Sequence, residues 1–456
     1  MKDWVRRASE LHHELGAIAE LDARWWLIAG GVAAAEPWPP RASYVWSDAE
    51  PGADTFIGHH VPAPIDPICD AIAAAHAARA AIRELDGALP DQPLAVTVRR
   101  SGEATLVPSA LDTAAFAIGS HRLIAKLADD VADEAVLARE LATLCAGANP
   151  PATTKGHPFV TISIGDEPLE TARHGHRRGW IDDAGPWLGV SRAGGMAIVS
   201  TCHIVVDGYG HSSLAAMIAD HRARLIERAP RGSIAHAPPL DRVAGAVPLG
   251  IAWRELTAPG PRALPLSYAL GQALHRAAGN PGARFSPTIQ VPVAPGAGDD
   301  PDRRRRRVVP AVVSVRFDHG HAEPYEVFEA RSRDALAREA AGTGLCARLM
   351  TAARAAPLSL SYKRKGFSAA RPRWLDSVAE VIGGRACVSR MRLDRAVPPS
   401  CAVSSPARLA SSSDRLGGCV ITVIDDGTRA AITVCGSGLA GTPLAARALL
   451  DQLLES

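Results

Sequence analysis

The chain places His203 four residues before Asp207 and five before Gly208, and these residue types at this spacing could do chemistry together. Histidine can remove a proton from an attacking group, because its pKa lies near neutral pH and its neutral ring has a free nitrogen. A base positioned in this way contributes about 10²–10⁴-fold in rate. His203 is therefore the candidate general base of the chain.

A predicted strand and a predicted helix must position this base. The apolar run 196–200 is typical of a buried strand, and together with 186–192 and the small-residue turn between them it predicts a hairpin that leads to His203. The segment 212–220 has a helical pattern, and this helix is expected to continue to about Arg228.

This strand, motif and helix resemble the His-x-x-x-Asp-Gly active-site signature of the chloramphenicol-acetyltransferase-like acyltransferases, sharply over residues 197–220. That superfamily includes condensation domains of peptide synthetases, plant BAHD acyltransferases and wax-ester synthases. The resemblance implies an α/β fold (α+β type) of two similar-sized halves, with mixed sheets around a central channel. It also implies transfer of an acyl group from a thioester to a hydroxyl or amine. The alternative is a solvent-facing histidine before an ordinary Asp-Gly turn.

The chain differs from the family pattern at two points, and these differences limit which branch of the family it resembles. Cys202 occupies the position where many condensation domains and wax-ester synthases have a first histidine, so His203 would act without a neighbouring histidine. The second motif of the plant branch, Asp-Phe-Gly-Trp-Gly, is absent from the chain. A plant-type enzyme is therefore not expected.

The resemblance also assigns supporting roles around His203. Asp207 would turn away from substrate into an ion pair with an arginine, for which Arg316 on the predicted strand 308–317 is the candidate, and Gly208 would permit a backbone turn that a Cβ hinders. His211 is expected to cap or line the helix start.

The oxyanion that forms during attack needs hydrogen-bond donors. Backbone N–H groups from Gly208 to Gly210 are one candidate set. Ser404 and Ser405 are another, because 400–406 resembles in part the Ser-Asn-Val-Pro-Gly-type strand that faces the histidine in condensation-type members, although Asn and Gly are missing.

Basic clusters are candidate contacts for the acyl donor. Lys363, Arg364 and Lys365 could receive the phosphates of coenzyme A or an acidic carrier protein, and the run Arg303 to Arg307 could do the same. A solvated loop is the alternative for both clusters. No permanently bound cofactor is expected. Acyl-CoA or a phosphopantetheine-borne acyl thioester would be the co-substrate, a small molecule the acceptor, and an acyl carrier protein the candidate partner.

Composition limits the other classes. The 456 residues carry a net charge of +2, which gives no general field for nucleic acid or membrane. No apolar run approaches the roughly 20 residues of a membrane span. Acidic residues precede the apolar stretch 25–35, which argues against a signal peptide and favours a cytoplasmic protein. Five lysines against 45 arginines, with abundant Ala, Gly and Pro, suggest a bacterial coding bias.

Cysteine and histidine positions predict no metal site. The eight cysteines form no Cys-x-x-Cys pair and are expected to be free, buried thiols. The histidine pairs at 12–13, 59–60 and 174/176 lack the spacing of zinc peptidases and are expected at the surface.

The predicted organisation is a first half, 1–228, that carries the motif, a Pro- and Gly-rich linker, 229–249, and a second half, 250–456. Within the halves, helices and strands are mixed without strict alternation, which argues against a doubly wound parallel sheet. Helices are expected at 3–22, 66–85, 130–146, 264–278, 324–341, 345–356 and 443–454. Strands are expected at 93–99, 103–107, 159–164, 287–293, 308–317, 401–404, 419–424 and 430–435, with a loop at 296–307.

Two alternatives to a general acyltransferase stay open. One is a condensation-like domain of secondary metabolism that acts on carrier-bound substrates. The other, from a different class, is a binding or scaffold protein that keeps the fold without catalysis.

Overall fold

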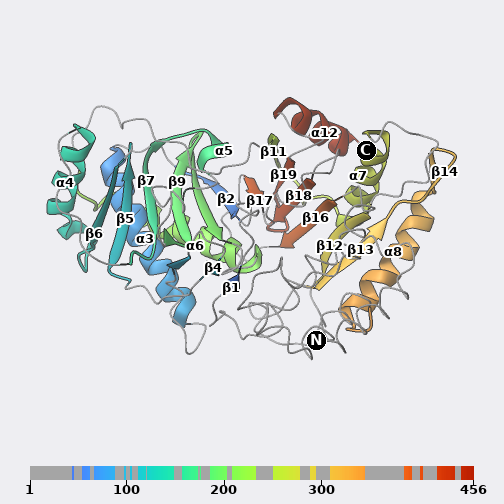
Figure 1. The fold of residues 1–456 in the computed structure, drawn as a ribbon, viewed down its shortest axis with the longest axis horizontal. Helices are drawn as coiled ribbons and strands as arrows, with labels where there is room; N and C mark the ends of the chain where they lie inside the picture. Colours follow the sequence, from blue (N-terminus) through green and yellow to red (C-terminus); the bar gives the residue numbers. More distant parts are fainter. Residues whose placement is uncertain are drawn as a thin grey trace.

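The described residues of the computed structural model form two large β-sheets that lie next to each other, each with helices packed against it (Figure 1). The first sheet, in blue and green, is built mainly from the first half of the chain, and the second, in yellow to red, from the second half. The structure describes residues 44–45, 54–61, 66–87, 97–98, 103–104, 111–119, 121–147, 157–172, 175, 185–202, 208–232, 250–277, 288–293, 309–344, 385–392, 401–403, 418–436 and 443–455.

The first sheet has the strand order β17-β2-β10-β9-β7-β5-β6. It is mixed, because β7 pairs in parallel with β5 and β9, whereas the other neighbours are antiparallel. Its strands are β2 (Asp54–His60), β5 (Thr113–Ile118), β6 (His121–Lys126), β7 (Thr161–Asp166), β9 (Leu188–Ala193), β10 (Met196–Cys202) and β17 (Cys401–Val403).

Helices α3 (Pro67–Gly87) and α6 (Gly208–Leu225) pack against each other and against this sheet. Asp66 starts α3, since its Oδ1 accepts from the N–H groups of Ile68 at 2.8 Å and Cys69 at 2.9 Å. Alanines dominate the buried side of α3, and these small side chains allow α6 to approach closely. Shorter helical segments are η2 (Val131–Asp133), α4 (Ala135–Cys145) and α5 (Leu169–Ala172).

The second sheet has the order β11-β19-β18-β16-β12-β13, with β16 parallel to both β12 and β18. Its strands are β11 (Gly250–Leu256), β12 (Thr288–Val293), β13 (Val309–Ser314), β16 (Arg385–Arg392), β18 (Gly418–Asp425) and β19 (Ala430–Gly436). Helices α7 (Ala263–Ala277), α8 (Tyr325–Ala340) and α12 (Pro443–Glu455) pack against it. Small two-stranded pairings join β1 (Tyr44–Val45) to β4 (Glu103–Ala104), β3 (Thr97–Val98) to β8 (Gly185–Pro186), and β14 (Phe317–Asp318) to β15 (His321–Ala322).

The expected fold class is confirmed: the chain is α/β, with a mixed sheet in each of two bodies. The hairpin β9–β10 turns at Gly194 and Gly195, whose φ values of 55° and 77° explain why glycines stand there. The hairpin β18–β19 is also as predicted. The predicted helices at 3–22 and 345–356, the loop at 296–307 and most of the linker lie outside the described residues.

The predicted strand 308–317 is interrupted in the structure. β13 ends at Ser314, and the chain resumes as β14 in a separate hairpin. The cause is a set of side-chain contacts: the Arg331 guanidinium donates to the carbonyl of Ser314 at 2.6 Å, and the N–H of Arg316 donates to Glu323 Oε1 at 2.9 Å. These contacts take the backbone groups that a continuing strand would offer to a neighbour.

Within the strands expected at 93–99 and 103–107, the structure describes β3 and β4, which pair with β8 and β1. The other residues of these two segments lie outside the described part of the chain. A separate correction concerns His59, which was expected at the surface and is only 1% exposed. It lies on β2, which is paired with β17 on one side and β10 on the other. His60, next along the same strand, is exposed.

No helix among the described segments is both long and apolar enough to cross a bilayer.

Candidate functional site

The strand and helix predicted to bracket the motif are present. β10 ends at Cys202, and α6 begins at Gly208. His203 and Asp207 fall in the segment 203–207, which lies outside the described residues, as do the side chains of 202 and 208–210. The two ends of the motif segment are therefore fixed by the structure, and its site can be built from what surrounds them.

His211 ties the two ends together. Its side chain is fully buried in the second turn of α6. Nε2 lies 2.9 Å from the carbonyl oxygen of Val199, and Nδ1 lies 3.2 Å from Thr201 Oγ1, both on β10. His211 was expected to cap or line the helix start, and in the structure its ring also reaches across to the strand.

The start of α6 also touches the second half of the chain. Ser212 Oγ lies 3.7 Å from Met391 Sδ on β16. Met391 and Ile424, near the carboxyl ends of β16 and β18, pack against the apolar core of the first half. The amino-terminal end of α6 therefore lies where the two bodies meet.

Strand β17 brings a second segment of the second half to the same place. It pairs antiparallel with β2, which pairs antiparallel with β10, so β17 and β10 run in the same direction. Phe56 of β2 lies opposite both Val403 and Ser200. The chain therefore leaves β17 and β10 at the same edge of the sheet. Ser404 and Ser405 follow Val403 directly, outside the described residues.

A row of hydroxyls lies buried in the sheet beside β10. Ser191 Oγ donates to Ser163 Oγ at 3.2 Å, and Ser200 is fully buried. A Cβ at Gly175 would overlap Ser191 Oγ and lie 3.4 Å from Ser200 Oγ. Only a glycine lets the backbone at 175 approach these hydroxyls so closely. The sheet next to the motif therefore contains a small buried cluster of hydroxyls, which the backbone at Gly175 covers closely.

Buried charges anchor the rest of α6. Arg222 donates to Asp70 Oδ1 on α3, and Arg192 on β9 approaches Asp70 Oδ2 at 3.3 Å. Burial lowers the pKa of Arg222 to about 10. One carboxylate thus joins α3, α6 and the sheet, which fixes the position of the helix that begins at the motif.

Apart from Arg316, the other predicted site residues lie either at the start of α6 or outside the described residues. Gly208 and Gly210 form the first turn of α6, where backbone N–H groups have no partner within the helix, as an oxyanion site requires. Lys363, Arg364 and Lys365 lie outside the described residues.

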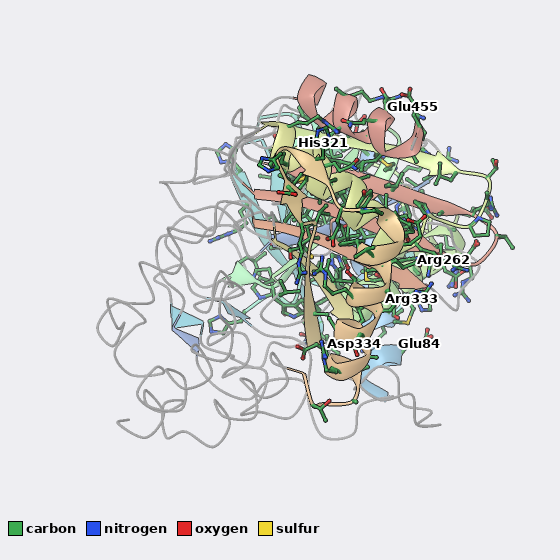
Figure 2. All side chains as sticks on the ribbon, turned by 90° about the vertical axis from the view of Figure 1, so that its right-hand side faces the viewer. Glu84, Arg262, His321, Arg333, Asp334 and Glu455 are labelled. Carbon is green, nitrogen blue, oxygen red and sulfur yellow. The ribbon has the colours of Figure 1, made fainter. Side chains whose placement is uncertain are left out.

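Arg316 is exposed, and its carbonyl and N–H are both bonded to Glu323. Its neighbouring hairpin lies at the right-hand end of Figure 1, away from α6. Figure 2 looks at that end, with Arg333 and Asp334 of α8 facing the viewer and His321 of the hairpin above them. The pair Asp207–Arg316 stays a prediction, and the described hydrogen bonds of Arg316 are made by its backbone to Glu323, between β15 and α8.

Sequence reasoning missed Arg390 on β16, whose guanidinium lies 2.6 Å from Asp425 Oδ2 on β18. Asp425 is buried, and its pair with Arg390 holds together the strand ends that meet α6. No periodicity could have indicated this pair, since the two residues are 35 positions apart in sequence.

Within the described segments, no group of three or more His, Cys, Asp or Glu side chains is arranged to hold a metal ion. The cysteines described there are free, as expected. Burial raises the pKa of the Cys387 and Cys419 thiols to about 12, so these two stay protonated and are poor nucleophiles.

Comparison with known proteins gives matches in structure only. No protein-family model matches the chain, and no curated protein matches it. The starter condensation domain of rhizomide synthetase is 11% identical, with 91% of this chain and 95% of that chain covered and a TM-score of 0.38. The first condensation domain of the CDA synthetase is 14% identical, with the same coverage and a TM-score of 0.40. The epimerization domain from the third module of tyrocidine synthetase B is 12% identical, with 90% and 93% covered and a TM-score of 0.35.

Condensation domains are among the proteins that the motif resembles. At TM-scores of 0.40 and below, these structures show only a distant likeness to this chain.

Proposed function

We propose that this chain is an acyltransferase that moves an acyl group from a thioester to a hydroxyl or amine, with His203 as general base. The main observation in support of the proposal is where the two elements that flank the motif lie. The strand end and the helix start are held together by His211, at the meeting point of the two bodies. A donor and an acceptor bound between the bodies would both reach this point.

In the proposed reaction, neutral His203 accepts the proton of the acceptor as its oxygen or nitrogen attacks the thioester carbonyl. The carbonyl oxygen becomes an oxyanion, for which the N–H groups at Gly208 to Gly210 are the proposed donors, with Ser404 and Ser405 as the further candidates. Collapse of the intermediate breaks the carbon–sulfur bond, and the leaving thiolate takes the proton from His203. No covalent enzyme intermediate and no resident metal or cofactor takes part.

Two donors fit this scheme, an acyl-CoA and an acyl group on the phosphopantetheine of a carrier protein. A condensation-like domain with carrier-bound substrates agrees with the names of the similar solved structures. Both donors are therefore arms of the test.

The test is release of free thiol from a panel of acyl-CoAs and acyl-carrier proteins, with and without hydroxyl and amine acceptors. We expect acceptor-dependent thiol release from one donor class, and its loss in His203→Ala. The matched control is His121→Ala, which removes an exposed histidine at the start of β6 and should leave the rate unchanged. Turnover unaffected by His203→Ala would overturn the role of the base. No turnover of any thioester would favour a scaffold protein that keeps the fold.

A further inference from the structure

His211 is a buried histidine that the proposed mechanism does not use. It is fully buried, and it makes hydrogen bonds from α6 to two positions on β10, Val199 and Thr201. These bonds join the two elements that flank the motif in sequence, because β10 ends at Cys202 and α6 begins at Gly208. The segment 203–207 therefore connects two elements that one side chain holds together.

The contacts define the role of one ring nitrogen. A carbonyl oxygen only accepts, so Nε2 carries the proton that is donated to Val199 at 2.9 Å. Nδ1 lies within hydrogen-bond distance of the hydroxyl of Thr201, at 3.2 Å. Both nitrogens of the ring therefore contact β10.

Thr201 and His211 are not a nucleophile and its base. Both side chains are fully buried, so substrate has no path to the hydroxyl. The pair acts on the backbone: it sets the distance and direction between the last residues of β10 and the second turn of α6. A catalytic base must be held close to its target, since a displacement of about 1 Å can cost about 10²-fold in rate.

We propose that His211 is a positioning residue for His203, and that the Thr201–His211–Val199 bonds hold the motif segment in the geometry that aims the base. This inference rests on the proposed function. It predicts that loss of the bonds lowers kcat while the KM for the thioester donor stays the same, because substrate binding does not involve the buried ring.

The test compares four variants in the thiol-release assay. His211→Leu removes both bonds at similar volume, and kcat should fall by about 10²-fold. His211→Gln can still donate an N–H toward Val199 and should recover most of that loss. Thr201→Val removes the hydroxyl at constant shape and should give a smaller fall in kcat. His221→Leu, on the same helix but bonded to Glu84 at the surface, is the matched control and should change nothing.

Three results would overturn the proposal: a His211→Leu kcat close to wild type, a rise in donor KM that accounts for the lost activity, or a His211→Gln variant as impaired as His211→Leu. Melting temperatures, measured alongside, separate loss of folded protein from loss of positioning.

Failure of the proposed function would look different, since wild-type protein would then release no thiol at all. In that case, amide hydrogen exchange of residues 203–207 decides the positioning role. Faster exchange in His211→Leu than in His221→Leu supports it, and equal exchange overturns it.

Discussion

The two bodies of the molecule have the same kind of architecture, a mixed sheet with helices packed on it, but the contacts that hold the helices to the sheet differ. In the first, directional polar contacts join the helices to each other and to the sheet: Asp70 with Arg192 and Arg222, and His211 with β10. In the second, α7 and α12 pack on the sheet mainly through leucines such as Leu270 and Leu450, and the polar contacts from helix to strand, Arg254 with Asp451 and Arg331 with the carbonyl of Ser314, are partly exposed. Hydrogen bonds between fixed partners constrain distance and angle more narrowly than apolar packing does. The body whose helices are held by buried polar contacts is therefore the one that carries the motif.

The largest difference between the two bodies is expected on substitution of Asp70, the buried carboxylate of the first body. Asp70→Asn removes the charge that balances Arg222, which is 2% exposed. An uncompensated buried charge destabilises by about 3–5 kcal/mol, so the free energy of unfolding in urea should fall by about that amount. The matched change in the second body is Asp451→Asn, whose partner Arg254 is partly exposed. It should cost at most about 1 kcal/mol. Equal losses in the two variants would mean that the anchoring of the bodies does not differ.

A pair of leucine truncations sharpens the same comparison. Leu214 on α6 and Leu270 on α7 are both fully buried. Each change to alanine should lower the free energy of unfolding by about 2–5 kcal/mol, because it removes buried methyl groups and leaves a cavity. Activity per folded molecule should fall in Leu214→Ala, because α6 begins at the motif. It should stay unchanged in Leu270→Ala. An equal loss of activity in Leu270→Ala would contradict this division of roles.

The smallest expected effect concerns the hairpin turn of the second body. Hydrogen bonds from the N–H groups of Arg429 and Thr428, together with the hydroxyl of Thr428, lower the pKa of Asp426 to about 2 from an ordinary value of 3.8. A carboxyl group with a lowered folded-state pKa stabilises the fold above its unfolded pKa, and this contribution is lost as the pH falls through the folded value.

Asp426→Asn should therefore reduce the dependence of stability on pH between about 4 and 2, measured by thermal melts. Asp426 is partly exposed, so solvent weakens its interactions and the change is expected to be small. The turn of β9–β10 offers the control, because there a separate carboxylate, Asp166, accepts from the N–H of Gly194 at 3.0 Å. If Asp166→Asn and Asp426→Asn show the same dependence of melting temperature on pH, the lowered pKa of Asp426 does not contribute specifically to stability in acid.

Much of the fold was predictable from sequence because the long periodic segments agree with their final structure. The alanine-rich helix α3, the helix α7 and the hairpins β9–β10 and β18–β19 all lie close to their predicted positions. Strands β5 and β16 gave no clear signal: β5 is largely alanine, and β16 carries three arginines among its eight residues. Small or charged side chains hide the alternation by which strands are detected.

The site was predictable only in part. The strand end and helix start around His203 follow from local pattern. The bond from His211 back to β10 does not, since a histidine in the second turn of a helix gives no sign of the face that it occupies. The pairing of β17 with β2 joins residues more than 300 positions apart, and no local pattern encodes a contact of that range.

The measurement that tests the central claim most directly is the rate of thiol release from an acyl thioester by wild-type protein and by His203→Ala, at saturating acceptor and equal folded concentration. A general base at position 203 predicts a fall of about 10²–10⁴-fold in the variant, while His121→Ala keeps the wild-type rate. A His203→Ala rate equal to wild type would contradict the claim that this histidine performs the chemistry.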